Sequence, residues 1–220
     1  MAEGRFLKTL YIHKPGALQN RVGGETLVVC GTARGMTSAA AYALHECGYF
    51  LGEKLGVKNY EDRDLINIFR KKRTVKQKPI KTLIDQRNFS HDRWGFKIPF
   101  ATEFVSDLLP MLRKPIFLFC VRNPLAASAS AARREKLPVD PLKTLNKSRM
   151  LLDAMDWMRE QDQPFIAADM DAVRLDPARF VAELSKTLNL KGDVNGIASA
   201  LSKPGYKPAD PQPGVTYCTQ

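Results

Sequence analysis

Short apolar runs alternate along the chain with longer segments in which apolar residues recur three or four positions apart. The apolar runs predict β-strands at Thr26–Cys30, Trp94–Lys97, Pro115–Val121 and Pro164–Ala168. Runs such as TLVVC and IFLFCV have no polar side, as expected of parallel strands that helices cover on both faces. This alternation of strands and helices is typical of an α/β domain with a mainly parallel sheet.

Helices are predicted where apolar residues recur at helical spacing and a capping residue or a proline begins the segment. The predicted helices are Thr37–Cys47, Asp62–Lys72, Thr102–Arg113, Pro124–Lys136, Pro141–Gln161, Asp176–Leu190 and Asp193–Leu201. Together with the strands they predict a three-layer α/β domain in which the mainly parallel sheet is central.

The remaining segments are predicted to be irregular. Residues 202–220 contain four prolines and no periodic spacing, so we expect an irregular tail after a core at about residues 25–201. The basic stretch Arg70–Lys81 is expected to be a loop. Residues 1–220 are therefore expected to form a single domain, which suits a chain of this length.

The composition narrows the class of protein. With 44% hydrophobic residues the chain can bury a core, which excludes an intrinsically disordered protein. No apolar run approaches the roughly 20 residues of a membrane-spanning helix, and the first residues lack the apolar stretch of a secretory signal. We therefore expect a cytoplasmic protein. Four cysteines without CxxC spacing and only three histidines predict no metal site.

The charge of the chain indicates an anionic partner. The formal net charge is +11 and the isoelectric point is about 9.6. Nucleic acid, a membrane surface and a phosphorylated small molecule all fit such an excess. Which of these three partners fits depends on where the cationic side chains lie in the fold.

The segment from Gly31 to Ser38 reads GTARGMTS and joins a predicted strand to a predicted helix. The first N–H groups of a helix lack partners and the helix dipole favours negative charge, so this order suits an anion. The P-loop template G-x-x-x-x-G-K-S/T fails, because Thr37 stands where ATP and GTP sites need lysine. An anion site and a plain turn capped by Thr37 or Ser38 both remain open.

A second motif begins at Arg122, directly after a strongly apolar strand, and continues as Asn123-Pro124. Open α/β folds bind ligands at the carboxyl edge of the sheet, and an arginine there suits a carboxylate or phosphate. Ser130 lies eight residues after Arg122 in the following helix. Taken alone, Ser130 is better explained as a small residue that allows close helix packing.

Together the two motifs resemble those of the sulfotransferases that use 3′-phosphoadenosine-5′-phosphosulfate (PAPS). The family's phosphosulfate loop, G-x-P-R/K-S/T-G-T-S/T, corresponds to the segment from Gly31 to Ser38. Its R-N/D-P motif, with a serine eight residues after the arginine, corresponds to Arg122 and Ser130. Weaker similarities are WGFKIP, NYEDRDL and the segment 165–190, so the resemblance covers roughly residues 25–190 in the family's order.

The loop departs from the family pattern at two positions. Gly35 and Met36 place the glycine one position early, and Met36 would be strained if its backbone needs a positive φ. The family's cytosolic animal members also use a histidine just after the lysine of the Lys-x-Pro element. Here Ile98 and Pro99 follow Lys97, so no histidine is assigned as base.

The resemblance implies a P-loop-like α/β sulfotransferase fold that moves a sulfonate group from PAPS to a hydroxyl or amine. It also implies which residues bind PAPS. The implied contacts are Arg34, Gly35, Met36, Thr37 and Ser38 for the 5′-phosphosulfate, and Arg122 and Ser130 for the 3′-phosphate.

Catalysis in such a site needs fixed cations and a base. Arg34 and Lys97 are expected to stabilise charge on the bridging oxygen as its bond to sulfur breaks, which requires no metal. Glu61 is the favoured base because the resemblance places its stretch near the acceptor. The other candidates for the base are Glu53, Asp62 and His91, with Asp62 equally suited to cap a helix. The acceptor is expected to be a small molecule or a saccharide, and acidic acceptors are among the candidates.

Other classes of protein remain as alternatives. A P-loop small-molecule kinase would use a metal-binding Asp169 after an apolar strand, but it lacks the loop lysine. A nucleic-acid-binding domain would use the Arg70–Lys81 stretch, which has no interleaved aromatic residues. An inactive member of the sulfotransferase family is the third alternative, suggested by Met36.

Overall fold

The computed structural model of the chain describes residues 3–72, 78–135, 140–203, 205, 207–208 and 211–219. Its central sheet has six strands in the order β1-β2-β7-β6-β3-β5. The parallel strands of this sheet are β3 (Thr26–Gly31), β5 (Trp94–Lys97), β6 (Ile116–Val121) and β7 (Phe165–Asp169). They coincide with the predicted strands, and the α/β class with a mainly parallel sheet is confirmed.

An antiparallel hairpin extends the sheet beyond β7. Its strands are β1 (Gly4–Phe6) and β2 (Leu10–His13), and β2 pairs with β7. The sequence did not predict this hairpin, because its strands of three and four residues leave too short a pattern.

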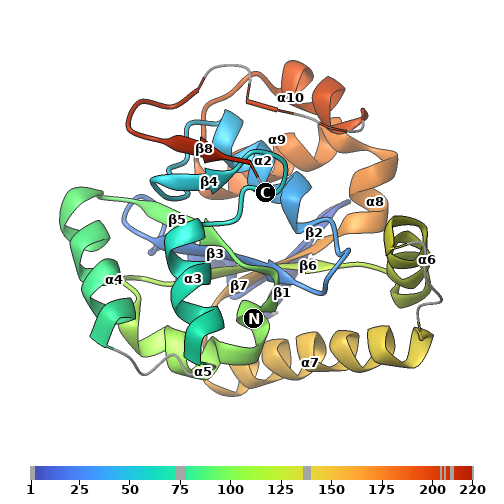
Figure 1. Ribbon diagram of the computed structural model, residues 1–220, viewed down its shortest axis with the longest axis horizontal. Coiled ribbons are helices and arrows are strands. Elements are labelled where there is room, and N and C mark those ends of the chain that lie inside the picture. The colour runs from blue at the N-terminus through green and yellow to red at the C-terminus, as the bar shows by residue number, and fades with distance from the viewer. Residues whose placement is uncertain are drawn as a thin grey trace.

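Helices cover both faces of the sheet (Figure 1). The helices on one face are α2 (Thr37–Glu46), α8 (Met170–Leu175), α9 (Pro177–Leu188) and α10 (Val194–Leu201). The helices on the other face are α3 (Arg63–Lys72), α4 (Lys78–Ser90), α5 (Val105–Leu108) and α7 (Pro141–Glu160). Alternate residues of β3 point into the two cores: Val29 packs with α2, and Val28 packs with the layer of α7.

The remaining elements lie at the ends of the sheet or beside it. They are α1 (Pro15–Gln19), β4 (Lys54–Gly56), the 3₁₀ helices η1 (Pro99–Phe104) and η2 (Leu109–Met111), α6 (Pro124–Glu135) and β8 (Thr216–Cys218). Lys136, where the sequence predicted α6 to end, lies outside the described residues. Among the described residues, no helix combines the length and the apolar character needed to cross a membrane.

Aspartate caps explain where several helices begin. The Asp140 and Asp176 side chains accept hydrogen bonds from the backbone at the start of α7 and α9, each followed by a proline. Asp169 and Asp193 cap α8 and α10 in the same way. Such caps satisfy N–H groups that the first helical turn leaves without partners.

One predicted helix is broken into three pieces. The segment predicted as Thr102–Arg113 instead consists of η1, α5 and η2. Phe104 has non-helical backbone angles (φ −129°, ψ 19°) between η1 and α5. Pro110 lies in η2, where it has no N–H to continue an α-helix.

Two segments that were predicted to be irregular contain regular structure. In the stretch Arg70–Lys81, α3 runs to Lys72 and α4 begins at Lys78, while residues 73–77 lie outside the described residues. The buried residues Ile80 and Ile84 give α4 an apolar side that its basic composition hides. In the tail 202–220, β8 pairs in parallel with β4, so this tail is not wholly irregular.

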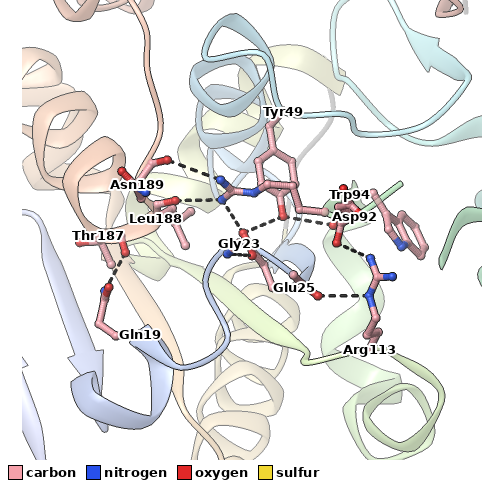
Figure 2. A network of polar contacts seen from close by, with 12 residues as sticks. Gln19, Gly23, Glu25, Tyr49, Asp92, Trp94, Arg113, Thr187, Leu188 and Asn189 are labelled. Atoms are coloured by element: carbon pink, nitrogen blue, oxygen red, sulfur yellow. Dashed lines mark hydrogen bonds and ion pairs between the residues drawn. The ribbon is translucent and has the colours of Figure 1, made fainter. Parts of the chain in front are cut away.

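A buried ionic network holds the amino ends of β3 and β5 (Figure 2). The fully buried Glu25 carboxylate accepts hydrogen bonds from Gly23 N (2.6 Å), Tyr49 Oη (3.1 Å) and Arg93 Nη2 (2.5 Å). Arg93 Nη2 also donates to the Leu188 carbonyl oxygen at the end of α9 (2.8 Å). The network therefore ties the sheet to α9 at the edge where the parallel strands begin.

Candidate functional site

The loop after β3 makes a tight turn that two glycines permit. A side chain at Gly31 would place its Cβ 2.6 Å from the Cys120 carbonyl oxygen, so glycine is required at this end of β3. Gly35 N donates to the Thr32 carbonyl oxygen (2.9 Å), and a Cβ at Gly35 would lie 2.7 Å from that oxygen. The loop thus turns back on itself before α2 begins.

Met36 adopts the backbone conformation that the sequence analysis considered strained. Its φ is 59° and its ψ is 22°, in the left-handed region, and Arg34 has a φ of 64°. Met36 is the N-cap position of α2 and makes no side-chain capping hydrogen bond. The first turn of α2 therefore presents N–H groups that no capping side chain satisfies.

The two motifs meet in space. Arg34 donates from Nε and Nη2 to Ser130 Oγ, at 3.2 Å and 3.0 Å. Arg122 Nη1 donates to the Arg34 carbonyl oxygen at 2.8 Å. The loop after β3 and the start of α6 therefore form one cationic surface at the carboxyl ends of β3 and β6.

Arg122 has spare capacity for a ligand. Its Nε forms an ion pair with Asp171 Oδ1 at 3.7 Å, a distance too long for a hydrogen bond. Among the described residues this buried Nε has no hydrogen-bond partner, and neither has the buried Thr32 Oγ1 of the loop. Buried polar atoms without a partner are costly, so both atoms fit a site completed by an anion.

Lys97 lies at the carboxyl end of β5 and is only 2% exposed. Its Nζ donates to Glu61 Oε1 (3.1 Å) and to Ser38 Oγ (3.4 Å). Burial lowers the pKa of Lys97, and the Glu61 carboxylate raises it. Glu61 therefore favours the charged form of an amine that burial would otherwise discharge.

A pocket of about 800 Å³ opens over these residues. The predicted site residues all line it except Gly35, which is in the turn of the loop, and Ser130, which lies against Arg34. The predicted residues that line it are Arg34, Met36, Thr37, Ser38, Glu61, Lys97 and Arg122. The structure thus brings the predicted donor-binding and catalytic residues to one place, while their roles remain predictions.

The rest of the pocket wall was not predicted. Lys58, Arg134 and Lys147 add cations from three separate segments of the chain. Phe100 and Met150 add apolar surface. These residues lie in segments without a readable motif, and only the topology of the fold brings them together.

The alternative bases lie elsewhere. Asp62 is fully buried, caps the start of α3 and forms an ion pair with Arg87. His91 stacks on Phe50, with 3.9 Å between the ring centroids, and Glu53 lies 3.7 Å from an Arg87 nitrogen. None of these three candidates lines the pocket, whereas Glu61 does.

The kinase alternative depended on Asp169 as a metal ligand. Its Oδ1 accepts hydrogen bonds from Asp171 N (3.0 Å) and Ala172 N (3.1 Å), which makes it the cap of α8. Asp169 does not line the pocket. The structure therefore gives this carboxylate a helix-capping role.

The fold and the site define an α/β protein with a cation-lined pocket at the carboxyl edge of a mainly parallel sheet. The structure is similar to that of sulfotransferase STF9 from Mycobacterium avium, at 13% sequence identity and a TM-score of 0.49. The similarity covers 86% of this chain and 69% of that one. No protein-family model and no curated protein matches the sequence. What this chain binds must therefore be inferred from its own residues.

Proposed function

We propose that the chain is a sulfotransferase, which moves a sulfonate group from PAPS to a hydroxyl or amine of an acceptor. The observation that carries the proposal is the contact between its two motifs. Arg122 and Ser130 lie 88 and 96 positions after Arg34 in the sequence, yet each is joined to Arg34 by hydrogen bonds beside the pocket. This is the arrangement that a doubly phosphorylated donor requires, with cations for both of its ends.

The donor would be held by the loop after β3 and by the start of α6. The N-terminus of α2 and the hydroxyls of Thr37 and Ser38 suit the 5′-phosphosulfate. Arg122, whose Nε lacks a hydrogen-bond partner among the described residues, suits the 3′-phosphate, and Ser130 lies close by. When bound, PAPS supplies the sulfonate group and leaves as adenosine 3′,5′-bisphosphate.

Lys97 and Arg34 both provide positive charge at the pocket. Lys97 is fixed by Ser38 and Glu61, so its ammonium group does not have to reorganise to meet developing negative charge. Glu61 takes up the proton that the acceptor hydroxyl or amine loses, since its carboxylate reaches the pocket beside Lys97.

The acceptor would be a small molecule or a saccharide that carries negative charge. Lys58, Arg134 and Lys147 also line the pocket, where they outnumber the one further carboxylate, Glu103, and the described residues give none of the three an ion pair. Phe100 and Met150 offer apolar contacts beside these cations. An anionic acceptor with an apolar or sugar face fits this combination.

Calorimetry with adenosine 3′,5′-bisphosphate tests the donor site. We expect the nucleotide to bind, and the Arg122→Ala variant to bind it roughly 5- to 150-fold more weakly, as loss of about 1–3 kcal/mol of charge-assisted hydrogen bonding implies. Arg133→Ala is the matched control, because Arg133 is exposed in α6 and does not line the pocket. Unchanged affinity in Arg122→Ala would refute the assignment.

Turnover of labelled PAPS with a panel of acceptors tests the reaction itself. Transfer of label to an anionic hydroxyl compound supports the proposal, and we expect Glu61→Gln to slow it. Thermal stabilisation by Mg-ATP without stabilisation by the bisphosphate would instead favour a kinase. Steeply salt-dependent binding of an oligonucleotide, unaffected by Arg122→Ala, would favour a nucleic-acid-binding domain.

A further inference from the structure

The C-terminal segment is attached to the turn that carries Glu61. Strand β8 pairs in parallel with β4, from Lys54 to Gly56. Two backbone hydrogen bonds extend this pairing, from Thr216 N to the Glu53 carbonyl oxygen (2.6 Å) and from Val57 N to the Cys218 carbonyl oxygen (3.1 Å). Figure 1 shows β8 beside β4, above the main sheet. The end of the chain therefore borders the segment that leads into the site.

Tyr217 of β8 also contacts the end of α2. Its hydroxyl lies 2.8 Å from His45 Nε2 and accepts a hydrogen bond from Gln212 N (3.0 Å). Which of Tyr217 Oη and His45 Nε2 donates in this contact depends on the tautomer of His45. Gln212 Nε2 donates to the His45 carbonyl oxygen (2.9 Å). Tyr217 and Gln212 thus hold His45 from two sides.

His45 in turn packs against Tyr60, the residue before Glu61. The two ring centroids are 5.3 Å apart, and the His45 and Tyr217 rings meet edge to face at 5.7 Å. Tyr60 is fully buried and has a φ of 55°, a left-handed conformation that an aromatic residue rarely adopts. Strain of this kind persists only where the surrounding contacts enforce it.

The turn from Gly56 to Glu61 is closed by its own hydrogen bonds. Tyr60 N and Asn59 N donate to the Gly56 carbonyl oxygen, and Gly56 N donates to the Glu61 carbonyl oxygen (3.1 Å). Asn59 Oδ1 accepts from Glu61 N (3.2 Å). Because the turn is a closed unit, the seating of Tyr60 sets the position of Glu61, whose carboxylate contacts Lys97.

We propose that Tyr217 is a positioning residue of the site, which acts through His45 and Tyr60 to hold Glu61 against Lys97. None of Tyr217, His45 and Tyr60 lines the pocket, so the effect has to pass through the turn. The catalytic meaning of this role rests on the proposed function, but the structural coupling does not. The C-terminal strand therefore supports the site, although none of its residues lines the pocket.

Hydrogen exchange and lysine labelling test the coupling without an acceptor. In Tyr217→Ala we expect the amides of residues 56–61 to exchange about tenfold faster, as loss of anchoring contacts implies. We also expect the pH profile of Lys97 acylation to shift to lower pH, because Glu61 no longer raises the pKa of Lys97. Phe89→Ala, which removes an aromatic ring that is 94% exposed, is the matched control and should change neither measurement.

The Glu61→Gln background separates positioning from general loosening. If Tyr217 acts through Glu61, adding Tyr217→Ala to Glu61→Gln leaves the Lys97 profile unchanged. A shift of equal size in both backgrounds, or unchanged exchange at residues 56–61 in Tyr217→Ala, would overturn the proposal. Should Tyr217→Ala fail to fold, Tyr217→Phe keeps the ring and loses only the hydroxyl contacts, and the same two readings apply. Failure of the donor site would appear separately, as absent binding of adenosine 3′,5′-bisphosphate.

Discussion

Met36 offers a direct test of strain at the pocket. A left-handed backbone costs a non-glycine residue roughly 1–2 kcal/mol, and glycine escapes this cost. Met36 is half-buried and packs against the core below α2, so removing its side chain forfeits about 1 kcal/mol of apolar burial. Glycine also loses about 0.5–1 kcal/mol through the greater freedom of the unfolded chain.

These contributions predict different stabilities for two truncations of the same side chain. Met36→Gly should unfold with a free energy within about 1 kcal/mol of the parent, because relief of strain offsets the losses. Met36→Ala keeps the strain and loses the packing, so it should be the less stable variant, by about 1 kcal/mol. Urea denaturation monitored by circular dichroism measures both free energies.

Ala39→Gly is the matched control for this comparison. Ala39 is buried inside α2, where glycine should be less stable than alanine by roughly 0.5–1 kcal/mol. The sign of the Ala-to-Gly difference should therefore reverse between positions 36 and 39. If Met36→Ala is as stable as Met36→Gly, the backbone at position 36 is not strained in solution and the reasoning fails.

Three further predictions concern buried ionisable side chains. Burial lowers the pKa of His45 from 6.5 to about 4, so the unfolded chain takes up a proton at a higher pH than the folded chain does. The free energy of unfolding should therefore fall by about 3 kcal/mol as the pH drops from 6.5 to 4. Urea titrations should show that a His45→Gln variant loses this pH dependence. Arg93→Ala leaves Glu25 buried without its cation and should cost about 3 kcal/mol, whereas adding Glu25→Gln should recover part of this loss in the same assay. Glu61→Gln should lower the pKa of Lys97 in a side-chain NMR titration, and an unchanged value would show that the pair is not formed in solution.

The sequence predicted β3, β6 and β7 because each is buried and contains an apolar run of at least four residues. The short strand pairs β1–β2 and β4–β8 were not predicted, since strands of three or four residues carry little pattern. In addition, β8 pairs with a strand about 160 positions earlier in the sequence. The basic composition around Lys78 and Lys81 led to the prediction of a loop, although Ile80 and Ile84 are buried on one side of α4. The helix predicted at Thr102–Arg113 is interrupted at Phe104, whose backbone is not helical, and again at Pro110, which has no N–H to continue it.

The site residues were predictable where they lie close together in one short segment of the sequence. Arg122 directly follows an apolar strand and Arg34 lies in the short loop after another, so their place at the carboxyl edge follows from the strands themselves. Lys58, Arg134 and Lys147 belong to a turn and two separate helices, and no local pattern relates them. Their convergence depends on how the layers pack, which a single sequence does not reveal.

The network around Glu25 and the pocket lie at opposite edges of the same sheet. Glu25 and Arg93 precede β3 and β5, whereas Lys97 and the glycine loop come at the ends of those strands. Replacing side chains of the pocket wall therefore leaves the groups that tie the strands to α9 untouched. A library that varies Lys58 and Lys147 should yield mostly folded proteins, so the ligands that this pocket accepts can be altered by mutation and selection.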